Sequence, residues 1–399
     1  MRMSKLGLLL ILCTYAGFGA DFGVTLSVLP EYDSRSDREF SFTGTLSPWV
    51  SALLSPTLGL YVSAAARLEY DEPPDPFLIE LDRTELSWRP VSTVFLQLGR
   101  QWFEDKPGLI ASGLFDGVQG SLGLGDARLS LGVFYTGFLY KETAKVIMNN
   151  HDLEMYGLEP DYGDMSSYFA SKRVLVPFTV EFPGFTARSS LALSAIAQFD
   201  VNGRETADSL QSQYLEFQYI LEPREPLHLT IAASAGLRET DDMRMGFAAL
   251  ARVDFEPPTA VQDLLSLQLR WSSGRGEDFI DAYFPVSSIP VGEIFPSRLS
   301  GLMYIKSAYM VRPHKSFSAE AGLSYYIRTD LTTLQDREFD PPSDSRLLGG
   351  ECYGSLVWAP QSLIRLSAEG GLFFPNLGGV FISGTELRWK AALGAVVSF

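Results

Sequence analysis

The sequence has little cysteine and histidine, and these residues are widely separated. It contains two cysteines, Cys13 and Cys352, and Cys13 lies in a segment that we expect to be removed, so no intramolecular disulfide is expected. The three histidines, His151, His228 and His314, lie far apart along the chain, and none has a nucleophile and an acid clustered around it. No glycine-rich phosphate loop follows a strand and precedes a helix. We therefore expect no enzyme, no metal site and no cofactor.

Positive charge is also scarce. The chain has 32 lysines and arginines against 48 aspartates and glutamates, which gives a formal net charge of −16. A protein that binds nucleic acid needs a basic surface to neutralise phosphates. The charge balance therefore excludes nucleic acid as an expected partner.

Beyond the first 20 residues there is no apolar run long enough to form a transmembrane helix. At the start of the chain, Arg2 and Lys5 precede the apolar run Leu6–Leu12, and small residues follow it. This order of charged, apolar and small residues is typical of a secretory signal peptide, and the apolar run is too short for a membrane anchor. We expect residues 1–20 to be the signal peptide and residues 21–399 to be a single domain.

Apolar residues at every second position are abundant. The last stretch, Glu386–Phe399, alternates between an apolar face and a face of charged or small residues, and Leu58–Glu69 does the same. Successive side chains of a strand point to opposite faces, so each stretch predicts a strand with one apolar face. Such an exported chain is either a soluble β-protein or a closed membrane barrel, because lipid accepts only structures that satisfy every backbone group.

The connections between the expected strands alternate between two kinds. Short turns, usually with proline, alternate with longer polar loops. The short turns occur at Arg89–Pro90, Pro183–Gly184, Pro223–Pro226, Pro257–Pro258, Pro313 and Pro360. A soluble sandwich has no reason to sort its connections in this way, whereas outer-membrane barrels do. We therefore predict an all-β fold: a transmembrane antiparallel up-and-down β-barrel of about 18 strands, with short periplasmic turns and longer extracellular loops.

The C-terminal strand carries a family resemblance. Its apolar face includes Trp389 and Val397 and ends at the terminal residue, Phe399. It resembles the terminal strand of bacterial outer-membrane β-barrels, and the whole mature chain looks porin-like. The resemblance implies that these three residues form the signal read by the barrel-assembly machinery. It also implies that outer-membrane lipid surrounds the protein in the cell outer membrane.

If the apolar row faces lipid, the polar row must face water inside the barrel, because a charge in lipid costs roughly 2–4 kcal/mol at the midplane. A barrel of this strand number is too wide for side chains to fill, so an aqueous pore is expected. The residues expected to line it are Arg67, Arg83, Glu85, Gln97, Gln101, Glu181, Glu216, Arg252, Asp254, Arg270, Glu320, Arg328, Glu351, Arg365, Glu369, Arg388 and Lys390.

These patterns predict a channel for passive diffusion of small hydrophilic solutes. The acidic excess lies mostly in the loops, and a negative mouth concentrates cations, so a weak cation preference is expected. The longest loop, Phe138–Arg173, either folds into the lumen as a constriction or caps the surface. Two other functions stay open: a surface adhesin whose barrel displays loops, and a transporter for hydrophobic substrates, against which the charged lumen counts. The sequence does not decide the oligomeric state.

Overall fold

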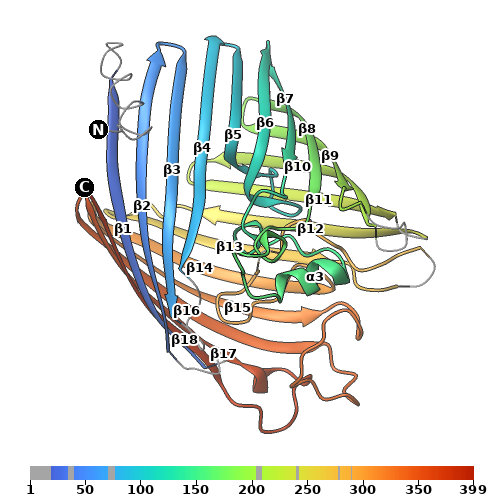
Figure 1. The fold of residues 1–399 in the computed structure, drawn as a ribbon. Helices are drawn as coiled ribbons and strands as arrows, with labels where there is room; N and C mark the ends of the chain where they lie inside the picture. The colour runs from blue at the N-terminus through green and yellow to red at the C-terminus, as the bar shows by residue number, and fades with distance from the viewer. Residues whose placement is uncertain are drawn as a thin grey trace.

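The protein forms a closed barrel of antiparallel strands (Figure 1). The computed structural model describes residues 19–34, 40–70, 77–203, 209–239, 242–276, 279–288 and 290–399. Nearly all of the expected signal peptide therefore lies outside the described residues. Eighteen strands form one sheet, which confirms the expected fold class and strand number.

The strands follow the chain without crossovers, and each pairs with its neighbours in sequence. They are β1 Ala20–Asp33, β2 Phe40–Ser55, β3 Leu58–Tyr70, β4 Leu78–Val91, β5 Val94–Glu104, β6 Ser112–Leu124, β7 Ala127–Tyr135, β8 Arg173–Thr186, β9 Ser189–Asp200, β10 Gln211–Arg224, β11 Leu227–Glu239, β12 Met243–Phe255, β13 Gln262–Ser272, β14 Leu302–His314, β15 Phe317–Arg328, β16 Leu347–Gln361, β17 Ile364–Phe374 and β18 Arg388–Ser398.

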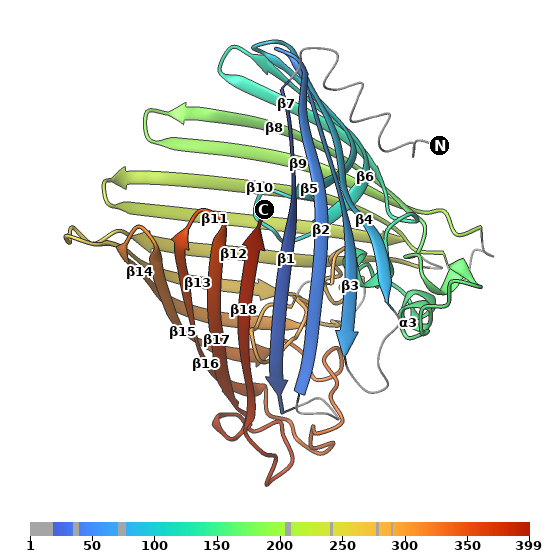
Figure 2. The same cartoon turned by 60° about the vertical axis from the view of Figure 1, so that its left-hand side comes forward.

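The first and last strands close the barrel, as Figure 2 shows for β1 and β18. Their register runs from Thr25 opposite Ser398 to Asp33 opposite Lys390. The terminal residue joins the seam as well, because the Phe399 amide donates to the Val24 carbonyl at 2.9 Å. Closure leaves no unpaired edge, which is the condition for placing strands in a membrane.

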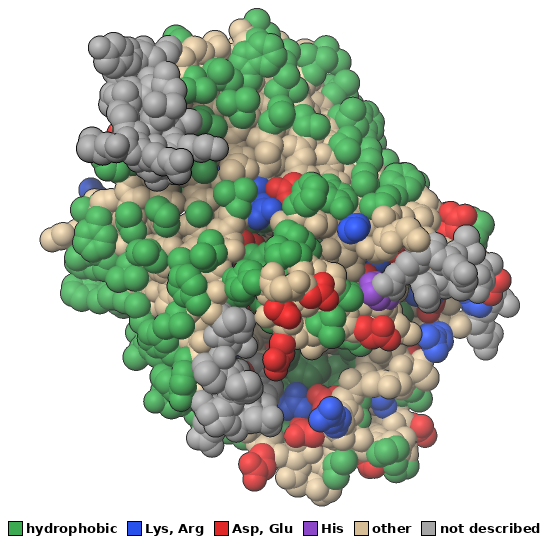
Figure 3. Space-filling model, viewed as in Figure 1, with side chains coloured by type: hydrophobic (Ala, Val, Ile, Leu, Met, Phe, Trp, Pro, Cys, Tyr) green, Lys and Arg blue, Asp and Glu red, His purple; other side chains and the backbone are tan. Residues whose placement is uncertain are grey.

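The two faces of each strand separate as the alternation predicts. On β13, Leu265, Leu267 and Leu269 are exposed on the outer wall, while Gln268 and Arg270 face inward. Hydrophobic side chains cover much of the outer strand surface in Figure 3, and charged groups gather toward the loops. No helix in the described ranges is long and apolar enough to cross a bilayer.

Connections are sorted by length between the two ends of the barrel. Seven of the eight connections at one end, here the short-turn end, have two residues, and the β12–β13 connection has six. In the β6–β7 turn, Gly125 has φ +59°, a left-handed conformation that glycine adopts without strain. The other end, the long-loop end, holds the β7–β8, β13–β14 and β15–β16 loops. The expected asymmetry is therefore confirmed.

We expect Leu267→Arg to destabilise the barrel in lipid by about 2–4 kcal/mol, because it places a guanidinium at the middle of an outward row. Leu267 is 52% exposed on the outer wall. The matched control is Gln268→Arg, one residue along and facing inward. Urea unfolding in lipid vesicles measures both variants. Equal losses for the two would contradict the assignment of the faces.

Candidate functional site: a bridged lumen

Loops from opposite walls meet inside the barrel. The β5–β6 loop and the β13–β14 loop start eight strands apart in the 18-stranded ring. The amides of Val286 and Ser287 donate to the Ile110 carbonyl at 2.7 and 3.2 Å, and the Ser112 amide donates to the Ser287 hydroxyl at 3.1 Å. We call these two joined loops the bridge: residues 105–111 together with residues 273–301 as far as they are described.

The bridge lies well inside the strands. In the β5–β6 loop, Lys106 forms an ion pair with Glu181 at 2.9 Å, and its carbonyl accepts from Gln218 at 3.2 Å. Both partners lie at least seven residues below the long-loop ends of β8 and β10. At roughly 3.3 Å per residue, that depth is at least about 23 Å along a strand. The loop therefore occupies the lumen and not the mouth.

Asp105 holds the β5–β6 loop in shape. Its carboxylate accepts from the amide of Leu109 at 2.8 Å, from that of Ile110 at 2.9 Å, and from that of Ala111. Charge-assisted bonds of this kind are stronger than neutral ones. The loop therefore presents Ile110 to the β13–β14 loop in a fixed position.

The first half of the β13–β14 loop is fastened to β10 and β11. The Tyr283 hydroxyl donates to the Ser234 hydroxyl at 3.0 Å, and the Tyr214 hydroxyl donates to the Phe284 carbonyl at 2.7 Å. Arg238 pairs with Asp281. Tyr214 and Tyr283 are fully buried, so this contact excludes water.

The second half is fastened to the β14–β17 side of the barrel. Glu351 of β16 accepts from three consecutive amides, those of Glu293 at 3.1 Å, Ile294 at 3.0 Å and Phe295 at 2.9 Å. Phe295 stacks on Phe373 of β17, with ring centroids 4.8 Å apart. Glu351 is only 3% exposed, so its carboxylate anchors the loop and does not border open water.

The sequence allowed the β7–β8 loop to be either a constriction in the lumen or a cap on the surface. In the structure one part of the loop lies against the bridge in the lumen, and another part lies at the surface. Its first part includes α2, Lys141–Ala144, and supports the bridge: the Lys145 carbonyl accepts from the Ser288 amide at 2.7 Å, and the Ile147 carbonyl accepts from Arg298 at 3.1 Å. Its second part includes α3, Asn150–Tyr156, which Figure 1 shows among the loops, and side chains there such as Leu158 are exposed.

Two tyrosines of the same loop hold the start of β4. Tyr168 donates to the Ile79 carbonyl at 3.0 Å, and Tyr162 donates to the Phe77 carbonyl at 2.9 Å. Burial raises the pKa of Tyr168 to about 12, with smaller contributions from the nearby Glu80 and Tyr162. The Tyr168 hydroxyl therefore stays protonated, and keeps its donor, throughout the neutral range.

One half of the lumen is filled at the level of the bridge; below it, on the β6–β8 wall, a cavity of about 360 Å³ is lined by polar and charged residues such as Arg128 and Glu181. Inward apolar side chains of β6–β12 pack with the bridge and the β7–β8 loop into one buried cluster, whose strand members are Phe115, Phe134, Leu175, Ile196, Tyr214, Ala232, Ala248 and Leu250. We call this the filled half. A second cluster, around Phe295 and Tyr326, closes only the long-loop ends of β14–β17.

The opposite half, walled by β14–β18 and β1–β4, carries charged pairs. Arg67 lies 3.5 Å from Glu69, the Arg83 Nε donates to Glu85 at 2.6 Å, and Lys390 lies 3.0 Å from Glu31. Lys306 lies 3.7 Å from Glu293 of the bridge. We call this the open half.

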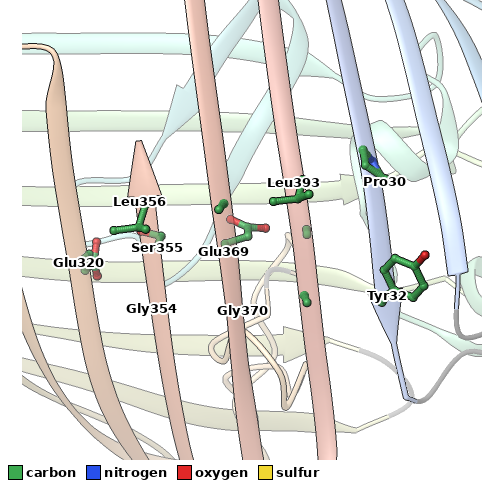
Figure 4. A pocket seen from close by; sticks show the side chains of 12 residues that line it. Pro30, Tyr32, Glu320, Gly354, Ser355, Leu356, Glu369, Gly370 and Leu393 are labelled. Carbon is green, nitrogen blue, oxygen red and sulfur yellow. The ribbon is translucent and has the colours of Figure 1, made fainter. Parts of the chain in front are cut away.

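A cavity of about 140 Å³ lies beneath the bridge in the open half, lined by Glu293, Glu320, Tyr353, Glu369 and Lys390 among others. A larger cavity of about 560 Å³ adjoins it at the β16–β1 wall, and Figure 4 shows the side chains around it. The two cavities share Glu320, Gly354, Ser355, Glu369 and Gly370, and the two glycines pair directly and have no side chains. The wall is therefore only one backbone thick at this point.

The structure separates the expected pore-lining residues into groups. Gln101, Glu216, Arg328 and Glu351 face inward but are buried beneath loops, which differs from the expected contact with water. Arg388 is held by Asp336 at 2.9 Å and Glu338 at 2.7 Å. Arg252, Asp254 and Arg365 lie near the short-turn end. Glu181 and Arg270 contact the β5–β6 loop, and Gln97 of β5 accepts from Gln119 of β6. The remaining expected residues line the open half: Arg67, Arg83, Glu85, Glu320, Glu369 and Lys390.

Sequence reasoning did not single out the bridge. The bridge segment 274–298 nevertheless carries Tyr283, Phe284, Val286 and Phe295. Large apolar side chains in an otherwise polar loop are the signal that could have shown it, because they need a buried partner.

The architecture matches solved structures at low sequence identity. No family model and no curated protein matches the chain. Three Pseudomonas aeruginosa structures are similar over nearly their whole length. OccK5 (OpdH) is 10% identical, with 95% of this chain and 98% of that chain covered and a TM-score of 0.60. OccK2 (OpdF) in complex with glucuronate is 13% identical, with coverages of 95% and 98% and a TM-score of 0.61, and the outer membrane protein OpdK is 11% identical, with coverages of 96% and 99% and a TM-score of 0.61. The chain has the fold of an outer-membrane porin. This fold confirms the resemblance to porin-like outer-membrane barrels that the C-terminal strand indicated.

Proposed function

We propose that this porin-like barrel is an outer-membrane channel for passive diffusion of small hydrophilic solutes, with a weak preference for cations, and that it is not an enzyme. The observation that carries the proposal is the bridge. At its own level it fills one half of the lumen with apolar side chains and leaves a half whose walls are charged. A charged wall needs water beside it, so the open half supplies a hydrophilic route.

The charge of the open half supports the cation preference. The inward residues of its described walls include the carboxylates Glu31, Glu69, Glu80, Asp82, Glu85, Glu293, Glu320 and Glu369 and the cations Arg67, Arg83, Lys306, Arg312, Arg365 and Lys390. An excess of negative charge in a narrow passage raises the local concentration of cations.

The same proposal covers location and assembly. After removal of residues 1–20, the barrel would lie in the outer membrane with its short-turn end in the periplasm and its apolar row in lipid. Trp389, Val397 and Phe399 would be read by the barrel-assembly machinery. The alternatives are weaker: a charged lumen does not suit hydrophobic cargo, and a barrel that only displays loops has no use for a charged route past the bridge.

Solute uptake tests the proposal. Purified mature protein is placed in liposomes, and swelling is followed with glucose, glucosamine and glucuronate. We expect all three to permeate, with glucosamine fastest and glucuronate slowest, because the route is acidic. OccK2 was solved with glucuronate, so it provides a comparison barrel. Failure of every solute to enter, with no current in planar bilayers, would favour the display function.

A further inference from the structure

The charged residues of the open half do not contribute equally. Most are neutralised where they stand: Arg67 by Glu69, Arg83 by Glu85, and Lys390 by Glu31, at 3.0 Å for the last pair. A close pair of opposite charges produces little field a few ångströms away. Selectivity should therefore come from a charge that has no such partner.

Glu369 is the most exposed such charge in the cavity beneath the bridge. It faces inward from the middle of β17, is exposed and lines the cavity beneath the bridge. Ser355 of β16 and Ala392 of β18 are its partners in register, and neither carries charge. Within the part of the chain that the structure describes, its carboxylate makes no hydrogen bond and no ion pair.

The nearby cations are engaged elsewhere. Lys306 lies over the Tyr353 ring at 4.6 Å and beside Glu293 at 3.7 Å. Lys390 pairs with Glu31. Arg365, on the same face of β17, is four residues away, about 13 Å along the strand, which exceeds the screening length of about 8 Å at physiological salt.

Of the other two carboxylates of the cavity, Glu293 is paired with a cation, and Glu320 is less exposed than Glu369 and is held by a hydroxyl. Glu320 accepts from the Tyr353 hydroxyl at 2.7 Å, and Glu293 has Lys306. The four groups Glu293, Lys306, Tyr353 and Glu320 thus form a chain from the bridge to β15, and Glu369 stands beside it. Figure 4 shows Glu320 and Glu369 projecting from different strands of this wall.

We infer that Glu369 is the residue that sets the charge selectivity of the passage, and that it favours solutes carrying a protonated amine. The inference rests on the proposed channel function and assigns its cation preference to one carboxylate in the lumen and not to the acidic loops at the mouth. A single uncompensated charge beside a narrow aqueous route acts on every ion that passes.

Reversal potentials across a KCl gradient in planar bilayers test the inference. We expect Glu369→Gln to lower the ratio of potassium to chloride permeability roughly two- to fivefold. Glu369→Lys should turn the channel toward anions. The matched control is Glu386→Gln, which removes an exposed carboxylate from the β17–β18 loop at the mouth and should lower the ratio much less. If the glutamine variant folds poorly, Glu369→Ser, which matches Ser355 and Ser367 around it, takes its place.

The outcomes separate the two proposals. A wild-type protein that forms no channel overturns the proposed function, and this inference with it. A conducting wild type whose permeability ratio is the same in Glu369→Gln, or falls equally in Glu386→Gln, overturns the assignment to Glu369 and leaves the channel standing. Glucosamine uptake gives a second measure, since it should slow in Glu369→Gln while glucose uptake stays unchanged.

Discussion

Replacing residues 282–296 of the β13–β14 loop with a short glycine–serine linker raises the single-channel conductance roughly three- to fivefold, because an 18-stranded barrel without a lumenal loop is a wide aqueous pore. The replaced segment includes Tyr283 and Val286, which pack in the filled half, and Phe295, which packs on Phe373. Its removal takes away the contacts with Ile110 and Glu351. Planar-bilayer recording in 1 M KCl measures the effect.

The control for this variant shortens a loop at the mouth. Residues 163–166 of the β7–β8 loop are exposed, and their removal should change the conductance by less than about twofold. Barrel formation is checked for both variants by resistance of the strands to protease. Equal conductance in the wild type and the bridge variant would show that the bridge does not limit the passage.

Asp152→Ala detaches α3 from the barrel and destabilises the protein by about 3 kcal/mol, the lower end of the usual effect of breaking a buried ion pair, because Arg173 keeps Asp200 as its second carboxylate. Arg173, at the start of β8, is 1% exposed, and its guanidinium lies 2.6 Å from Asp152 and 3.4 Å from Asp200. Asp152 also accepts from the amides of Met148 and Asn149, which begin the helix. Its loss therefore removes the ion pair and the helix start together.

Two measurements check this effect: urea unfolding in lipid vesicles, and the rate of protease cleavage within residues 149–160. Cleavage should become faster in Asp152→Ala while the strands stay resistant. Glu154→Ala, on the exposed side of the same helix, is the matched control and should behave as the wild type does. A similar loss of stability in both variants would refute the role of the buried pair.

Much of the barrel could be predicted because its rules are local. The period of two in Leu265–Leu269 determines which side chains face outward, and the same rule places Arg270 inside. On β14 apolar and polar residues do not alternate regularly, and the neighbouring strands decide which way its side chains face: Lys306 pairs in register with Gln268 of β13 and Ser324 of β15, both on inward rows. A strand that alternates poorly takes its facing from the strands that pair with it.

The candidate site was less predictable, because it depends on contacts between distant parts of the chain. The inward direction of Glu351 followed from alternation, but its burial did not, since the three amides that cover it come from a loop more than fifty residues away in sequence. Glu369 has the same facing and stays exposed. Two glutamates with one sequence pattern therefore have different environments.

By itself, the sequence determined that the chain is a barrel of about 18 strands, which face of each strand is apolar, and at which end the long loops lie, since each of these depends on side-chain period and turn length. Only the tertiary structure decided that two loops from opposite walls meet at Ile110 and Val286, that one half of the lumen is filled at the level of the bridge, and that Glu369 has no hydrogen-bond or ion-pair partner among the described residues. The physical reason is that loops have no periodic pattern: apolar side chains such as Tyr283 and Phe295 are buried wherever the closed barrel brings a surface within reach.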